Sequence, residues 1–161
     1  MSFQSFKKLV GNKLKFGLFL FMKLPSAYVS GVRLRSIDEE ECVTSVPYKW
    51  LSQNPFKSTY FACQAMAAEM STGLLSMGHS YKANPAISML VIKLEAQYFK
   101  KAIQRTYFTC SNGMAIKEAI AKSTQTSEAQ LVECTSVGKN SQGELISEFK
   151  ITWSFKAKTG V

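Results

Sequence analysis

The stretch that decides the fold runs from Ser58 to Met77 and reads STYFACQAMAAEMSTGLLSM. It is rich in alanine and methionine, lacks strand-like alternation, and is apolar on nearly all sides. Ser58 or Thr59 can cap the helix that this composition predicts. A helix that is apolar all round is a buried helix. The sequence therefore predicts a long central helix over residues 58–77, with the other elements packed around it.

Segments with strand-like alternation lie on both sides of this helix. In the last of them, one face consists of Leu145, Phe149, Ile151, Trp153 and Phe155. We expect further strands around residues 32–35, 41–46, 90–98, 105–110 and 129–137 and an exposed second helix over 112–122. In the 90–98 strand, the predicted apolar face is Leu90, Ile92, Leu94, Ala96 and Tyr98. The simplest packing is an α+β fold in which a curled antiparallel sheet of about six strands wraps around the helix.

Length and charge narrow the function classes. The chain has 161 residues, 46% of them hydrophobic, which is enough for a single domain over residues 1–161 and argues against long disorder. The net charge of +9 favours anionic partners such as nucleic acid, acidic lipid or a phosphate-bearing ligand like coenzyme A. Because no nucleic-acid recognition motif is present, we expect no nucleic-acid partner.

The cysteines give no sign of a metal site. Cys42, Cys63, Cys110 and Cys134 form no CxxC pair, and the single histidine, His79, has no cysteine near it. Each cysteine lies in an apolar or strand-like setting, as reduced core thiols do. We therefore expect no metal, no cofactor and a reducing, cytoplasmic location.

Residues 1–24 form a basic and apolar segment that ends before Pro25. Four lysines precede the apolar run Phe16–Met22, which is at the lower limit for a signal peptide and far below the ~20 residues needed to span a bilayer. We interpret residues 1–24 as a retained amphipathic helix that covers the sheet or a subunit. Weak contact with a membrane surface is the alternative, because lysines beside phenylalanines also suit an anionic interface.

Glu69 is the residue that stands out. It is the one formally charged residue between Lys57 and Lys82, and it lies in the middle of the apolar helix. A carboxylate in a dry setting has a raised pKa, which is how a general base is poised. The alternative is that one stripe of the helix reaches solvent, and that this wetter stripe holds Glu69 together with Gln64, Ser71 and Ser76.

Asn54 precedes Glu69 by fifteen residues and lies in the loop before the helix. This spacing and the order of elements resemble the hotdog-fold thioesterases, specifically the phenylacetyl-CoA thioesterase-like branch and an uncharacterised group related to it. That family has an Asn in the loop, a His-Gly-Gly beginning six residues later, and an Asp or Glu fifteen residues after the Asn. The resemblance covers most of the chain after Pro25, including a glycine-containing hairpin and a final strand with tryptophan.

The resemblance implies hydrolysis of an acyl-CoA or related acyl thioester without a metal. Glu69 would be the base or nucleophile, the Phe61 N–H an oxyanion donor, and Asn54 would position water or substrate. Ser88 is the nearest candidate for a serine that some members use. The resemblance also implies a homodimer or dimer of dimers, in which Asn54 and Glu69 of one site come from different subunits.

One departure from the family pattern supports a second hypothesis. Where the family has His-Gly-Gly, this chain has Tyr60-Phe61-Ala62. Phe61 replaces the glycine that lets substrate approach the backbone, although Tyr60 can donate a hydrogen bond in place of the histidine. The second hypothesis is therefore a non-catalytic hotdog protein that binds an acyl chain or lipid.

Overall fold

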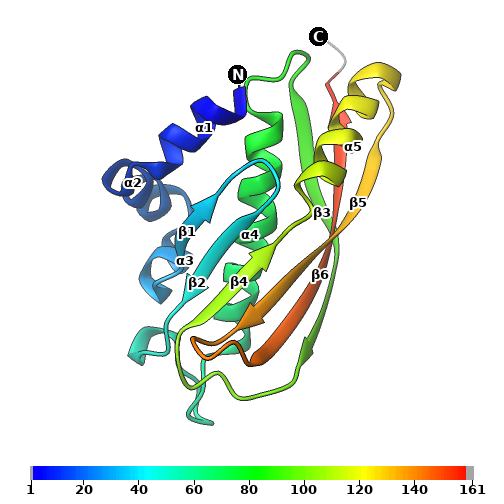
Figure 1. The fold of residues 1–161 in the computed structure, drawn as a ribbon. Helices are drawn as coiled ribbons and strands as arrows, with labels where there is room; N and C mark the ends of the chain where they lie inside the picture. The colour runs from blue at the N-terminus through cyan, green and yellow to red at the C-terminus, as the bar shows by residue number, and fades with distance from the viewer. Residues whose placement is uncertain (1, 159–161) are drawn as a thin grey trace.

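An antiparallel sheet curls around the long helix α4, and three short helices pack on the side of α4 that the sheet leaves open (Figure 1). The computed structural model describes residues 2–158. Within them the order of elements is α1 (Ser2–Gly11), α2 (Lys13–Lys23), α3 (Pro25–Ser30), β1 (Arg33–Ile37), β2 (Cys42–Val46), a 3₁₀ turn (Trp50–Ser52), α4 (Phe61–Ser80), β3 (Ile87–Tyr98), β4 (Thr106–Cys110), α5 (Gly113–Thr126), β5 (Gln130–Lys139) and β6 (Leu145–Ala157).

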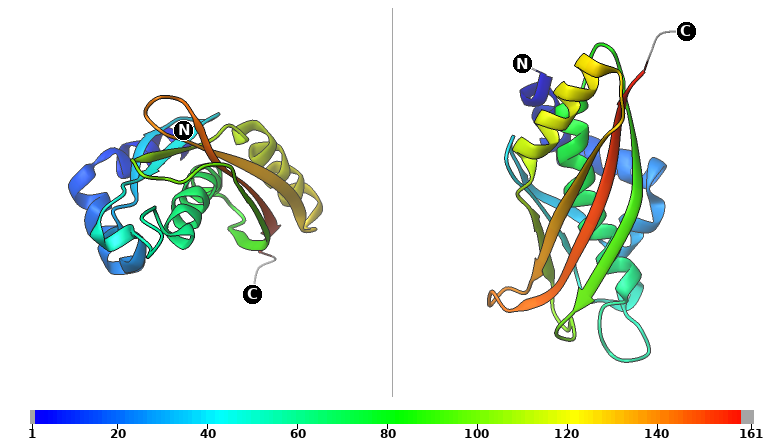
Figure 2. Two further views of the ribbon diagram at one scale, coloured as in Figure 1. Left: turned by 90° about the horizontal axis from the view of Figure 1, so that it is seen from below. Right: turned by 90° about the vertical axis from the view of Figure 1, so that its right-hand side faces the viewer.

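The sheet has the strand order β1-β2-β4-β5-β6-β3, with every neighbouring pair antiparallel. The long strands β3, β5 and β6 bend together, so the sheet half encloses α4 (Figure 2). β6 lies between β5 and β3, and its inner face buries Phe149, Ile151, Trp153 and Phe155 as the alternation predicts. Leu145, predicted on the same face, is exposed because it lies at the hairpin end of the strand. The predicted hotdog architecture, with about six strands around a long central helix, is confirmed.

The predicted apolar face of β3 is wrong in its first half. Leu90 and Ile92 are exposed, whereas the odd-numbered Met89 and Val91 pack against the core. The register with β6 shifts at Ile92, because Val91 pairs with Trp153 and Lys93 with Thr152. One extra residue in a strand moves all later side chains to the other face. After this bulge Leu94 is still exposed, but Ala96 packs against the core and the Tyr98 ring meets the buried Phe149 ring at 5.7 Å.

Helix α4 begins and ends three residues later than the sequence predicts. Its N-cap is Tyr60, which makes no side-chain capping hydrogen bond. The Thr59 hydroxyl, expected as a possible cap, instead donates to the carbonyl of Ala102 at 3.1 Å. The helix buries most of its surface, as its all-round apolar composition predicts.

The N-terminal segment is not the single helix expected over residues 1–24. The chain turns at Asn12, whose side-chain oxygen caps α2 by accepting from the Lys15 N–H at 3.0 Å, and Pro25 opens α3. α1 packs against the C-terminal end of α4, where the Phe3 ring lies 4.8 Å from the His79 ring. Among the helices of residues 2–158, none is long and apolar enough to cross a membrane.

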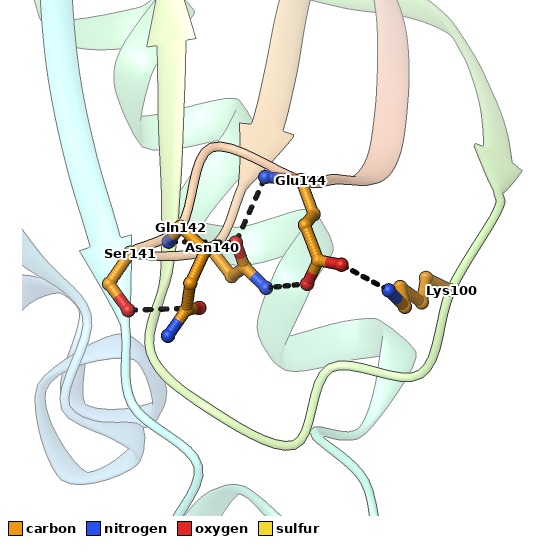
Figure 3. A network of polar contacts seen from close by, with 5 residues as sticks. All are labelled: Lys100, Asn140, Ser141, Gln142 and Glu144. Carbon is orange, nitrogen blue, oxygen red and sulfur yellow. Dashed lines mark hydrogen bonds and ion pairs between the residues drawn. The ribbon is translucent and has the colours of Figure 1, made fainter.

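The β5–β6 hairpin is held by a polar network (Figure 3). The side-chain oxygen of Asn140 accepts from the N–H groups of Gln142 and Glu144, each at 3.0 Å. The Glu144 carboxylate also pairs with Lys100, from the segment that follows β3. The Asn140 side-chain amide also donates to the Glu144 carboxylate at 2.6 Å, and the hydrogen bonds from Lys100 and Asn140 lower the pKa of Glu144. The network ties the end of β3 to the hairpin and fixes where Lys100 lies.

Candidate active site

Glu69 lies half-buried in the middle of α4 and lines a cavity of about 210 Å³. The walls come from α2, α4 and the nearby parts of β3 and β6, and include Phe16, Leu20, Met89 and Trp153. We call this space the Glu69 hollow. Because its walls are nearly all apolar, it suits a hydrocarbon chain with one acidic group at its side.

The Glu69 carboxylate has no hydrogen-bond or ion-pair partner among residues 2–158. Lys23 also lines the hollow, but it forms no ion pair with Glu69. Burial raises the pKa of Glu69 above its ordinary value, because the dry surroundings disfavour the charged form. The sequence-based interpretation of Glu69 as a desolvated carboxylate therefore agrees with its surroundings.

Gly73 provides the space for the Glu69 carboxylate, one helical turn further along α4. A Cβ atom at position 73 would lie 3.1 Å from Glu69 Oε1 and 3.4 Å from the Trp153 ring. The Trp153 indole N–H donates to the Thr72 hydroxyl at 2.9 Å, which fixes the ring against the helix. Gly73 and Trp153 therefore set the position of the carboxylate.

The alternative for Glu69 was a polar stripe of α4 that reaches solvent and also holds Gln64, Ser71 and Ser76, and the structure does not show this stripe. Gln64, Ser71 and Ser76 are buried and hydrogen-bonded: for example, the Gln64 side chain accepts from the Ser147 hydroxyl at 2.8 Å, and the Ser71 and Ser136 hydroxyls lie 2.8 Å apart. The half-exposed residues next to Glu69 are Ala62, Ala65 and Met66. The stripe that leads from the start of α4 to Glu69 is therefore apolar.

Asn54 organises the loop before α4. Its side-chain oxygen accepts from the N–H groups of Phe56 and Ser58 and from the Ser58 hydroxyl, at 3.0 to 3.2 Å. Asn54 lines a second cavity of about 330 Å³, the Asn54 hollow, together with Phe61, Gln64, Tyr98, Lys100 and Lys101. Its amide NH₂ group has no acceptor among residues 2–158 and is free to donate.

The first turn of α4 leaves donors unused. The N–H groups of Phe61 and Ala62 have no acceptor in the described part of the chain, as is usual for the first residues of a helix. The side chain of Phe61 is 56% exposed, and its ring lies 4.8 Å from the Tyr60 ring in an edge-on arrangement. The two rings thus stand beside the donors that an oxyanion would need.

The structure does not bring all the predicted site residues together within one chain. Glu69 lies eight residues beyond Phe61 on α4, roughly 12 Å at 1.5 Å per residue. Glu69 and Asn54 line different hollows with no residue in common. Ser88 is exposed on β3 and faces away from Met89, which does line the Glu69 hollow.

Sequence reasoning missed the residues that enclose the Glu69 hollow. Phe16, Phe19 and Leu20 come from α2, and Trp153 from β6. Trp153 was predicted to face inward, but nothing local in the sequence shows that it meets Glu69. The α2 residues reach the hollow only because the chain turns back at Asn12 and Pro25.

Several solved structures are similar to this one. A Pseudomonas aeruginosa protein of unknown function has a TM-score of 0.73 and 13% identity, over 98% of this chain and 97% of its own. A Haemophilus influenzae thioesterase has a TM-score of 0.64 and 11% identity, over 89% of this chain and 90% of its own. A Staphylococcus aureus thioesterase has a TM-score of 0.59 and 15% identity, over 79% of this chain and 94% of its own.

The S. aureus protein was solved as two alanine variants, one at a glutamine and one at a glutamate fifteen positions further along. No protein-family model and no curated protein matches the present sequence. At such low identities the shared feature is the arrangement of the sheet and its central helix. This chain has the fold of the hotdog thioesterases.

Proposed function

We propose that the protein hydrolyses acyl thioesters, such as acyl-CoA, with Glu69 as general base or nucleophile and without a metal. The observation that carries this proposal is the unpaired carboxylate of Glu69 at the side of an apolar hollow, in a fold shared with thioesterases. A carboxylate whose pKa is raised above its ordinary value can accept a proton from water and release it again during turnover. The hollow would hold the acyl chain, with the thioester carbonyl next to Glu69.

The start of α4 supplies the complementary chemistry. The free N–H groups of Phe61 and Ala62 would stabilise the oxyanion, helped by the positive end of the helix dipole. The free amide of Asn54 would orient water or substrate. Lys101 lines the Asn54 hollow, and Lys57 lies in the Asn54 loop, where its N–H donates to the Asn54 carbonyl. Both would attract the phosphates of coenzyme A, whereas Glu144 neutralises Lys100.

A homodimer would complete the site. Since Asn54 and Glu69 line separate hollows in one chain, and the first turn of α4 lies roughly 12 Å from Glu69, we propose that each site takes Asn54 and the N–H donors at the start of α4 from one subunit and Glu69 from the other. The free edge of β3, where Leu90, Ile92 and Leu94 are exposed, is a suitable place for two sheets to join. The fifteen-residue separation of the S. aureus variants equals that of Asn54 and Glu69, which supports treating the two residues as a functional pair.

A second candidate, a non-catalytic acyl-binding protein, is favoured by Phe61. The exposed ring at the first position of α4 would restrict the approach of a thioester carbonyl to the backbone donors. A protein of this kind would still hold an acyl chain in the Glu69 hollow. The two candidates differ only in turnover.

A hydrolysis screen tests the proposal directly. The purified protein would be assayed with acyl-CoA substrates of increasing chain length, with Glu69→Gln as the inactive control. We expect hydrolysis that depends on chain length and disappears in the variant. If no substrate is cleaved while acyl-CoA still binds, the acyl-binding function replaces the enzymatic one.

Two further proposals concern the surroundings of the protein. We place it in the cytoplasm, since its four cysteines are free thiols buried in the core. Intact-mass analysis of protein from its native host would contradict this if the mature chain began near Ala27. We also propose weak contact of the N-terminal helices with a membrane surface.

A further inference from the structure

Helix α2 has two apolar faces, and the fold covers one of them. Phe16 and Leu20 point inward and are 8% and 1% exposed. The outer face consists of four side chains that are 57% to 87% exposed, namely Leu14, Leu18, Phe21 and Met22. These positions have the spacing i, i+4, i+7, i+8 and so form one continuous stripe. Monomeric proteins seldom expose such a stripe without a partner for it.

The chain around α2 is strongly basic. Residues 1–37 contain seven lysines and arginines and no acidic residue, which accounts for seven of the nine net positive charges. Lys13, Lys15 and Lys23 of α2 are exposed and form no ion pair within residues 2–158. Lys15 precedes Leu18 and Met22 by three and seven residues and so borders the apolar stripe, whereas Lys23 lines the Glu69 hollow. The lysines of the segment are free to meet an anionic surface around α2.

We propose that α2 docks the protein on anionic lipid surfaces, with its outer stripe inserted among the headgroups and its lysines against the phosphates. An amphipathic helix with lysines beside bulky apolar residues binds such interfaces both by burying its apolar side chains and by electrostatic attraction to the anionic lipids. A second copy of the chain is the competing occupant. Pairing two α2 stripes would bring two segments of charge +7 together, and this repulsion favours anionic lipid over self-association.

Docking also bears on the substrate, and this step rests on the proposed thioesterase function. The inner face of α2 lines the Glu69 hollow through Phe16, Phe19 and Leu20. A helix with its side chains is about 10 Å thick, so docking brings the hollow to within one helix diameter of the lipid. The substrates that fit this placement are thioesters of long acyl chains that partition into membranes.

Vesicle co-sedimentation of the full chain tests the docking. We expect binding to phosphatidylcholine vesicles that contain phosphatidylglycerol and little binding to phosphatidylcholine alone. The double variant Lys13→Gln/Lys15→Gln should bind about 25-fold more weakly, at about fivefold per lysine. Leu18→Gln should lose about tenfold, because it removes one large apolar side chain from the lipid.

Matched controls exist on the sheet and on α5. Leu131 is 61% exposed on β5 and Leu18 is 60% exposed, so Leu131→Gln changes the same chemistry at the same exposure. Lys122 on α5 is exposed, and Lys122→Gln is the control for the loss of charge. Both control variants should bind vesicles like the unchanged protein. Absence of binding to the anionic vesicles, or equal losses in the control variants, would overturn the proposal.

Light scattering and kinetics separate the remaining outcomes. If Leu18→Gln lowers the mass of the particle in solution, a second copy covers α2 and the lipid proposal is wrong. For the substrate step, anionic vesicles should stimulate hydrolysis of long-chain acyl-CoA by the unchanged protein. Leu18→Gln should lose this stimulation and keep its rate on short-chain acyl-CoA in solution. If vesicles bind but no thioester is cleaved, docking stands and the enzymatic function fails.

Discussion

Replacing Glu69 by glutamine keeps the shape of the side chain and removes its ability to carry charge. In the proposed mechanism this removes the base, so thioester hydrolysis should fall by about 10² to 10⁴, the usual contribution of general-base catalysis. This corresponds to about 3–5 kcal/mol of transition-state stabilisation. The loss should appear in kcat, because the apolar walls that bind the acyl chain are unchanged.

Stability should change in the opposite direction, and it should depend on pH. Burial raises the pKa of Glu69 in the folded state above 4.5, whereas the unfolded chain keeps the ordinary value. Well below pH 4.5 Glu69 is protonated in both the folded and the unfolded state, so it does not affect the free energy of unfolding. As the pH rises toward the folded-state pKa, the unfolded state releases its proton first and is favoured. The unchanged protein should therefore lose stability with rising pH in this range, and Glu69→Gln should lose less.

The size of this effect follows from the missing partners. A buried polar group without a partner costs about 1–3 kcal/mol, and more if it is charged. Since the amide of the variant is also unpaired, we expect a net gain of about 1–2 kcal/mol above the folded-state pKa. For a chain of this length that is a rise in Tm of about 2–8 °C, at about 2–4 °C per kcal/mol.

The assay pairs initial rates with thermal melts at acidic and at mildly basic pH. Glu118→Gln on the exposed surface of α5 is the control, because its carboxylate is solvated and has no partner within residues 2–158. It should change neither rate nor pH dependence. A Glu69→Gln variant that hydrolyses thioesters at the full rate would refute the catalytic role. A variant with a lower Tm at every pH would show that Glu69 is structural.

Three other variants probe the rest of the site. Gly73→Ala should change the free energy of unfolding by no more than about 1 kcal/mol, because a better helix former offsets the crowding. Its new Cβ atom would lie 3.1 Å from Glu69 Oε1, so it should displace the carboxylate and reduce kcat. Asn54→Asp should keep the side-chain oxygen that holds the loop, so Tm should not change, but hydrolysis should be lost because the amide NH₂ group is removed. A drop in Tm without a loss of hydrolysis would assign Asn54 a structural role. Phe61→Gly should raise hydrolysis if the ring restricts the oxyanion donors, and an unchanged rate in the same assay would contradict that restriction.

The central helix and the last strand could be predicted because their signals are local. An all-round apolar run leaves few alternatives to a buried helix, and alternation in β6 assigns Phe149, Ile151 and Phe155 to the core without knowledge of their neighbours. The first half of β3 could not be predicted in this way. Its side chains alternate as regularly as those of β6, but the bulge at Ile92 depends on how β3 pairs with β6.

The fold of the N-terminal segment could be predicted only in part. Helical structure before Pro25 follows from composition, but the chain gives no local signal for which stripe of α2 faces inward. Phe16 and Leu20 are no more apolar than Leu14 and Leu18, so the sequence cannot tell the covered face from the open one. The choice depends on the shape of the surface that α4 presents to α2. For the same reason, the sequence identified Glu69 but not the walls around it.

The strongest argument that Glu69 is kept for an incoming molecule lies in the hydrogen bonds it does not make. Donors are close by: the Thr72 hydroxyl lies three residues further along α4, and the Trp153 ring packs beside Gly73. These donors are used elsewhere, since Trp153 donates to Thr72 and the Thr72 hydroxyl donates to the backbone carbonyl of Glu69 itself. A carboxylate retained for stability would be paired, because an unpaired buried charge is costly. Glu69 is instead surrounded by groups that hold its position and leave its oxygens free, which is the arrangement that a base acting on water or a thioester requires.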